Sequence, residues 1–179
     1  MKVKNETTMN SRFFKLCFRK LLLKMDQLQE LQEKWSSENI KVSRLANDEE
    51  ICAFESAYNA RLPQDLKEYF KQVNGTNDQS DSEFIQFYSL DKIKKVSETY
   101  DGWHGVPDYK LIVKTLDEHE KYYAFANYNI HVFCYAIKLT ASESENEVLV
   151  IGGGEYKKIA NSFTGFIDLY LNDSDELLF

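Results

Sequence analysis

The order of hydrophobic patterns along the chain predicts an α+β fold, an antiparallel sheet with helices packed on one face. Three amphipathic segments with helical spacing occupy residues 25–75, and runs rich in β-branched and aromatic residues follow between 84 and 151. A last amphipathic segment begins at Ser162. Helices followed by strands and a closing helix are typical of α+β domains, in which both kinds of element bury their apolar faces in one core.

Three helices are predicted before the first strand. Apolar residues with helical spacing predict the first over residues 25–35. The second starts at Asn47, and Glu50 follows three residues later, so each side chain can cap the backbone of the other residue. The third begins at Leu62–Pro63, because proline suits a first helical turn, and ends at Asn74–Gly75, two residues that tolerate the left-handed conformation.

Strand-like runs follow a polar loop at residues 76–83. The polar stretch 141–147 is expected to connect a hairpin, and Gly152–Gly154 to end the last strand. One short helix is predicted over residues 90–100 after Ser89, and the closing helix begins after Ser162. The expected strands lie at residues 84–88, 111–113, 122–126, 131–139 and 148–151.

Charge is distributed unevenly along the 179 residues, whose net charge is −7. Residues 1–24 carry seven basic residues and one acidic residue, whereas residues 25–179 carry fifteen basic and twenty-eight acidic residues. An acidic body disfavours direct binding of nucleic acid, because recognition of phosphate depends on cationic side chains. It suits a basic protein partner, although an acidic surface also serves solubility alone.

The basic segment 1–24 differs in composition from the single domain that we expect over residues 25–179. Lys15, Arg19 and Lys20 interrupt its apolar residues, so neither a secretory signal nor a membrane span is predicted. Three interpretations stay open. The segment can be an amphipathic arm that touches a membrane surface or an acidic partner, a helix that packs on the domain, or an extension outside the functional unit.

The cysteine pattern favours a reducing compartment. Cys17, Cys52 and Cys134 are odd in number and widely spaced, and they form no Cys/His metal-binding pattern. Apolar neighbours predict that Cys52 and Cys134 are buried thiols. We therefore expect a cytoplasmic protein.

One stretch of the sequence is typical of a known superfamily. Residues 54–75 read FESAYNARLPQDLKEYFKQVNG. This resembles the SUKH signature, in which a helix containing a glutamate precedes Leu-Pro, a second helix with aromatic residues and Asn-Gly. The matching positions are Glu55, Leu62, Pro63, Tyr69, Asn74 and Gly75, with Asp65, Leu66 and Phe70 between them.

A second stretch strengthens the resemblance. Residues 159–171, IANSFTGFIDLYL, are similar to the closing helix of the family, with Ser162 and Phe163 at its start. Residues 125–139 resemble its central strand pair. The resemblance covers roughly residues 26–175, and Asn59 departs from it, since the family often has glycine there. Asparagine also tolerates a positive φ, so the turn can be kept.

The resemblance implies an α+β fold that binds other proteins. Many bacterial members of the superfamily are immunity proteins encoded beside polymorphic toxins, often nucleases or deaminases, and fungal members regulate cell-wall synthesis as interaction hubs. The signature residues are expected to be structural, because they set helix ends or fill the core.

Residues able to do chemistry do not form an established catalytic pattern. His104 lies near Asp101 and Asp108, and His119 lies among acidic residues, but HxH and HExxH spacings are absent. The run 151–156 is rich in glycine, yet it lacks the residues of a phosphate-binding loop. We therefore expect neither an enzyme nor a bound cofactor or metal. A metal-dependent hydrolase that uses His104, Asp101 and Asp108 is kept as an alternative.

Two acidic loops are better candidates for a binding site. The second also carries aromatic residues, a combination typical of interface hot spots. The alternative is that Trp103 is buried and the acids only solvate its loop. The candidate residues are Asp78, Asp81 and Glu83 in the first loop, and Tyr100, Asp101, Trp103, Asp108 and Tyr109 in the second.

The function predicted from the sequence is that of an immunity protein. It would bind and neutralise a cognate toxin, a nuclease or another nucleic-acid-directed protein, by stoichiometric protein–protein contact. A regulatory interaction scaffold is the second hypothesis. The sequence leaves the oligomeric state open.

Overall fold

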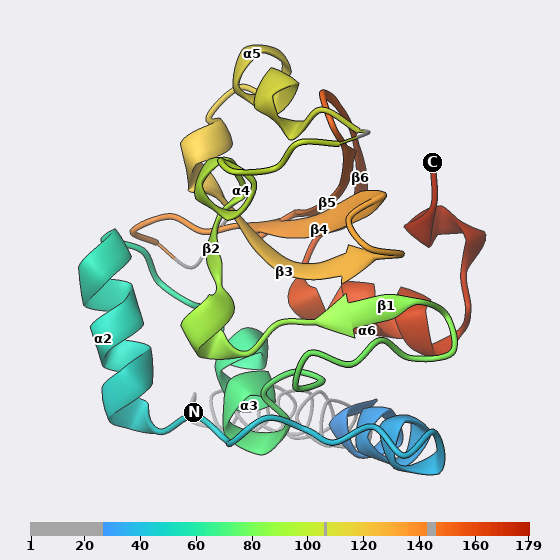
Figure 1. The fold of residues 1–179 in the computed structure, drawn as a ribbon. Coiled ribbons are helices and arrows are strands. Elements are labelled where there is room, and N and C mark those ends of the chain that lie inside the picture. Colours follow the sequence, from blue (N-terminus) through green and yellow to red (C-terminus); the bar gives the residue numbers. More distant parts are fainter. Residues whose placement is uncertain (1–26, 106, 143–145) are drawn as a thin grey trace, which may run out of the picture.

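A six-stranded antiparallel sheet forms the centre of the molecule (Figure 1). The computed structural model describes residues 27–105, 107–142 and 146–179, so the basic segment 1–24 lies outside the described residues. The strand order is β1-β3-β4-β5-β6, and β2 pairs with β3 alongside β1. The strands are β1 (Ile85–Phe87), β2 (Lys94–Lys95), β3 (Tyr122–Tyr128), β4 (Phe133–Lys138), β5 (Val148–Gly152) and β6 (Glu155–Ala160).

The longer helices gather on one face of the sheet, as the α+β prediction requires (Figure 1). Residues 27–37 are helical, and they are followed by α2 (Asp48–Tyr58) and α3 (Gln64–Gln72). The closing helix α6 (Phe163–Leu171) packs against both α3 and β6. Their interface with the sheet is aromatic: Phe166 lies 5.9 Å from Phe87 and 4.8 Å from Phe125, measured between ring centroids.

Short helical turns cover the opposite face. These are α4 (Val96–Thr99), α5 (Ile112–Thr115) and the 3₁₀ turns η2 (Tyr109–Leu111) and η3 (His119–Lys121). The 3₁₀ turn η1 (Leu90–Lys92) lies instead beside α2 and the end of α3. A further turn, η4 (Asp175–Leu177), follows α6. Because both faces are covered, every residue of β4 from Cys134 to Ile137 is buried.

The predicted helix caps are present. The Asn47 side chain accepts a hydrogen bond from Glu50 N at 2.9 Å, and the Glu50 carboxylate accepts one from Asn47 N at 3.0 Å. Helix α3 begins one residue after Pro63, and Asn74 and Gly75 both have positive φ where it ends. Ser162 caps α6 by accepting from Gly165 N at 3.0 Å. Local polar groups therefore define these helix ends.

Three local predictions were wrong. The helix predicted over 90–100 is divided, because Lys94 and Lys95 pair with β3 as strand β2 between η1 and α4. Residues 111–113 are helical, since a run of three apolar residues does not distinguish a strand from a helical turn. Strand β6 lies beyond the predicted end of the sheet, and its polar edge sequence carries little hydrophobic signal.

The two described cysteines differ from each other. Cys134 is fully buried, as predicted, whereas Cys52 is exposed on α2. The apolar neighbour Ile51 points to the core, and the next residue on a helix is rotated by about 100° away from it. The prediction of a buried Cys52, which was based on its apolar neighbours in sequence, was therefore wrong.

Candidate functional site

The SUKH-like motif forms an internal scaffold between α2 and α3. The Glu55 side chain is buried, and its carboxylate accepts hydrogen bonds from Leu62 N at 2.8 Å and from Lys67 Nζ and Arg61 Nη1, both at 2.9 Å. Burial alone would raise the pKa of Glu55, but these donors outweigh it, so the pKa lies below its ordinary value. Asn59 supplies the left-handed turn, with φ 48°.

Asn74 and Gly75 hold α3 against the chain that follows β1. The buried Asn74 amide accepts a hydrogen bond from Leu90 N at 2.8 Å and donates one to Arg44 O. Gly75 has φ +84°, and a Cβ at this position would lie 2.7 Å from the backbone of Ser89. Only glycine fits so close a backbone approach. These contacts are internal.

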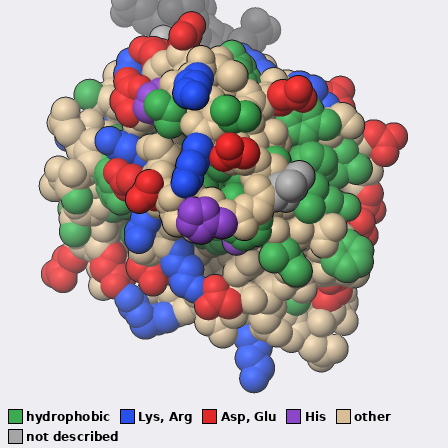
Figure 2. Space-filling model, turned by 45° about the horizontal axis from the view of Figure 1, so that its top comes forward, with side chains coloured by type: hydrophobic (Ala, Val, Ile, Leu, Met, Phe, Trp, Pro, Cys, Tyr) green, Lys and Arg blue, Asp and Glu red, His purple; other side chains and the backbone are tan. Residues whose placement is uncertain are grey.

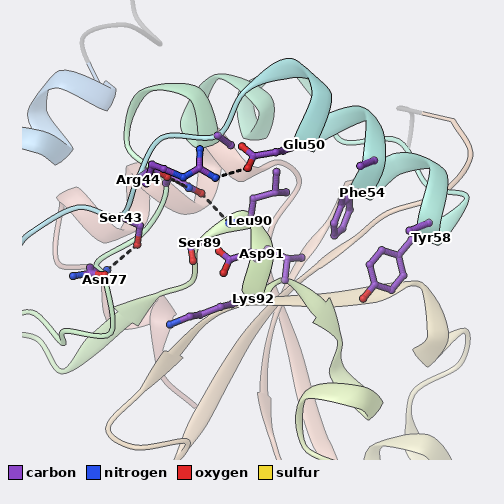
Figure 3. Close-up of a pocket in the computed structure, with 15 residues that line it drawn as sticks. Ser43, Arg44, Glu50, Phe54, Tyr58, Asn77, Ser89, Leu90, Asp91 and Lys92 are labelled. Carbon is purple, nitrogen blue, oxygen red and sulfur yellow. Dashed lines mark hydrogen bonds and ion pairs between the residues drawn. The ribbon is translucent and has the colours of Figure 1, made fainter.

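A groove of about 580 Å³ lies beside this scaffold (Figure 3). Helix α2 forms one wall, residues 43–46 another, and residues 89–93 the third. Phe54 and Leu90 give it an apolar floor, while Arg44 and Lys92 bring positive charge. Arg44 pairs with Glu50 on α2.

The groove combines apolar side chains with paired positive and negative charges. Lys92 pairs with Asp78, so both groove cations have a carboxylate partner. Among the described residues that line the groove there is neither histidine nor cysteine. The arrangement supports contact with a polar partner, and it supplies no base adjacent to a nucleophile.

The first predicted acidic loop does not form one cluster. Asp78 is exposed beside Lys92. Asp81 is buried, where it accepts a hydrogen bond from Ile85 N at 2.8 Å and another from the Tyr170 hydroxyl. Burial raises the pKa of Asp81, and its contacts are structural. Glu83 is exposed, so Asp81 must be removed from the predicted surface contacts.

The second loop rests on a buried aromatic pair. Tyr100 and Tyr109 stack with their centroids 4.1 Å apart and are only 3% and 2% exposed. Burial raises the pKa of both hydroxyls well above the ordinary tyrosine value. These two residues therefore support the loop and cannot be the exposed aromatic contacts that the sequence predicted.

Trp103 on the same loop is half-buried. Its indole Nε1 donates a hydrogen bond to Pro107 O at 3.0 Å, and its ring meets the His131 ring edge-on at 5.1 Å. Asp101 and Asp108 are exposed on either side. The loop thus exposes two carboxylates, and the contacts of Trp103 and the Tyr100–Tyr109 stack hold it in place.

Three connections meet at one end of the sheet, which we call the turn end: the described part of loop 101–108, the β3–β4 turn at 129–132, and the β5–β6 turn at Gly153–Gly154. Trp103 contacts His131 of the second connection. A Cβ added at Gly153 would lie 2.8 Å from the Pro107 Cβ, so the third connection also touches the loop.

The histidines do not assemble a metal centre in the described part of the chain. There, no three His, Cys, Asp or Glu side chains are close enough together to hold a metal ion. His104 is exposed between Asp101 and Asp108, whereas burial lowers the pKa of His131. The geometry therefore gives the hydrolase alternative no support.

The sequence pattern did not single out two apolar residues at the turn end. Phe84 and Ile130 are 58% and 79% exposed. The sequence predicts Phe84 as the first residue of a strand and leaves Ile130 between two predicted strands, and the only signal at each position is an apolar side chain beside polar residues.

Within the described ranges, no helix is long and apolar enough to cross a membrane. A search of curated proteins found no match. Residues 45–169 match the SMI1 / KNR4 family (SUKH-1), and this match covers most of the chain, including all of the stretch 54–75 and most of the stretch 159–171. The chain therefore belongs to the SMI1/KNR4 (SUKH-1) family.

Proposed function

We propose that this chain is an immunity protein that neutralises a basic toxin by binding it stoichiometrically in the cytoplasm. Membership of the SUKH family supports a role in protein binding without catalysis. The acidic balance of residues 25–179 favours a basic partner over nucleic acid. We take a nuclease or another nucleic-acid-directed toxin as the partner class, because such a toxin has a basic surface and must be inhibited in the cell that produces it.

The observation that carries this proposal is the exposed acidic loop at the turn end. Asp101 and Asp108 lie on a loop fixed by the Trp103–Pro107 hydrogen bond and by the Tyr100–Tyr109 stack. Fixed carboxylates lose little conformational entropy on binding, and they attract a cationic surface over about one Debye length. Occupation of a basic toxin groove by this loop would exclude the toxin's substrate.

Charge reversal tests this proposal. The probe is the basic protein encoded beside this gene, and its binding is followed by biolayer interferometry at about 50 mM and about 300 mM salt. We expect Asp101→Lys/Asp108→Lys to slow association about tenfold or more at low salt, because steering depends on local charge. Trp103→Ala should mainly accelerate dissociation.

A matched control separates local from overall charge. Glu30→Lys/Glu49→Lys changes the net charge equally, at two exposed positions on the helix at 27–37 and on α2. It should reduce the association rate only a few-fold. Equal effects of both double variants, or no binding by the neighbouring gene product, would contradict the proposed function.

A further inference from the structure

Two exposed apolar side chains at the turn end are held in an unfavourable backbone conformation. Phe84 has φ +62° and Ile130 has φ +56°. Ile130 lies between Asn129 at φ 46° and His131 at φ 67°, so three consecutive residues are left-handed. A β-branched residue is strongly disfavoured there, and such strain is characteristic of functional sites.

Both side chains lie mostly outside the core. Phe84 is 58% exposed and Ile130 is 79% exposed, whereas Ile85 beside Phe84 is 3% exposed. Asparagine or glycine would fit both backbone positions with less strain. Their apolar character therefore calls for an explanation outside the folded chain.

The backbone of Phe84 lies opposite Asn129, the residue before Ile130. Asn129 N donates a hydrogen bond to Phe84 O at 2.8 Å, and the next register pair is Ile85 with Tyr128. Tyr128 stacks on Phe133 with centroids 5.5 Å apart, which continues the apolar surface away from Phe84. Figure 2 shows hydrophobic side chains gathered on the right of that view, over the end of the sheet where the C-terminus lies in Figure 1.

The rim of this apolar surface is acidic. A hollow of about 240 Å³ is lined by Phe84, Tyr128 and Leu178 together with Glu83, Asp173 and Asp175. Lys34 pairs with Asp173 at 3.5 Å, and Lys157 donates a hydrogen bond to Leu178 O at 2.6 Å. Two carboxylates of the hollow, those of Glu83 and Asp175, lie beside the apolar residues without a partner recorded among the described residues.

We infer that Phe84 and Ile130 are the apolar anchors of a docking surface for a basic protein, with Glu83 and Asp175 as its acidic rim. The charge selects the occupant, because the acidic body of a second copy (residues 25–179), an anionic membrane or nucleic acid would bring like charge to the rim. A partner that presents an apolar side chain within a field of Lys or Arg is complementary.

This inference deepens the proposed function, on which it rests for the class of partner. Ile130 adjoins His131, whose ring contacts Trp103, so anchor and acidic loop belong to one continuous end of the molecule. Apolar anchors determine dissociation and acidic loops determine association, so the two parts have separate kinetic signatures.

The test separates a role in binding from a role in folding, because relief of backbone strain should preserve stability while loss of the apolar side chain weakens binding. Ile130→Asn and Phe84→Asn replace each anchor by a residue that tolerates positive φ. We expect the melting temperature to be unchanged or higher, and the dissociation constant for the neighbouring basic gene product to rise about tenfold or more. Val42→Asn, at a 42% exposed site, is the matched control and should leave binding unchanged.

A second probe makes the result independent of the toxin. The peptide Lys-Lys-Leu-Trp-Lys-Lys, compared with Lys-Lys-Ser-Ser-Lys-Lys, is titrated into ¹⁵N-labelled protein. We expect only the first to shift amides at 83–85 and 128–131, and Ile130→Asn to abolish these shifts. That result supports the anchors even if the toxin fails to bind.

Three outcomes would overturn the inference. Peptide shifts located elsewhere, or unaltered by Ile130→Asn, would refute the anchors while leaving a toxin contact through Asp101 and Asp108 possible. A fall in melting temperature comparable with that of a core variant would show that Ile130 serves the fold. Concentration-dependent dimerisation lost in Ile130→Asn would identify a second copy as the occupant.

Discussion

Neutralising Glu55 is expected to destabilise the fold in a pH-dependent manner. Glu55→Gln keeps the side-chain shape and an acceptor for Leu62 N, but it removes the charge that meets Lys67 and Arg61. The Arg61 side chain is 59% exposed, so its pair contributes little. The lost stability therefore comes mainly from Lys67 and from a weaker hydrogen bond to Leu62.

The magnitude follows from these two interactions. A pair as enclosed as Glu55–Lys67, with side chains 6% and 18% exposed, contributes on the order of 1 kcal/mol. A buried hydrogen bond to a charged acceptor exceeds a neutral one by about 1 kcal/mol. We expect the free energy of unfolding to fall by about 2 kcal/mol at pH 7, which corresponds to about 4–8 °C in melting temperature.

The stability that the Glu55 charge contributes is expected to be lost at low pH. The pKa of Glu55 is lowered in the folded protein, so its charge contributes stability above the ordinary glutamate pKa of about 4.3. That contribution is lost as the pH falls through the folded-state pKa. The difference between wild type and Glu55→Gln should therefore be full at pH 7 and should shrink below pH about 4.

Urea unfolding followed by tryptophan fluorescence measures the free energy of unfolding of both proteins at pH 7 and at low pH. Glu49→Gln is the control on the same helix, because Glu49 is exposed and its change should stay within about 0.5 kcal/mol. A Glu55→Gln protein as stable as wild type at pH 7 would refute the reasoning. So would an undiminished difference at pH 3.5.

Three further predictions concern backbone, cap and thiol. Gly75→Ala should reduce the free energy of unfolding by about 2–4 kcal/mol, because its Cβ meets backbone at 2.7 Å and its φ is +84°; a neutral effect in urea unfolding would contradict the close approach. Asn47→Ala should cost about 1 kcal/mol by the same assay, and loss of less than about 0.3 kcal/mol would show that the capping box is unimportant. Burial raises the pKa of Cys134 to about 12, so in a Cys17→Ser background a thiol reagent at pH 8 should label Cys52 and leave Cys134 unmodified until urea is added; equal labelling rates would refute the assignment.

Much of the fold could be predicted because local sequence signals agree with the tertiary contacts. Asn47 and Ser162 mark helix starts that side-chain hydrogen bonds confirm. Strands β3, β4 and β5 carry long apolar runs, and all were found within two residues of the observed bounds. Strand β6 was not predicted, because only Ile159 and Ala160 of its six residues are buried.

The candidate site was harder to predict, because exposure depends on the whole fold. Tyr100 and Tyr109 look like surface anchors in a polar loop, but each stacks on the other beneath that loop. Asp81 looks like a loop acid, yet it accepts a buried hydrogen bond from Tyr170. Conversely, positive φ at Ile130 arises from turn geometry that composition does not encode.

The separate positions of the scaffold and the proposed binding surface explain why family membership predicts protein binding better than it predicts the partner. Arg61 N donates a hydrogen bond to Thr140 O at 2.7 Å, which places the α2–α3 turn of the family motif beyond the end of β4 that lies away from the 129–132 turn. At about 3.3 Å per residue, the strand separates the two by roughly 20 Å. Under the proposed function, substitutions at Ile130, Phe84 or Asp101 change what is bound without touching the contacts of Glu55 or Asn74. Because the motif fixes the fold and, in our proposal, the turns supply the contacts, members of the family can share the first and differ in the second.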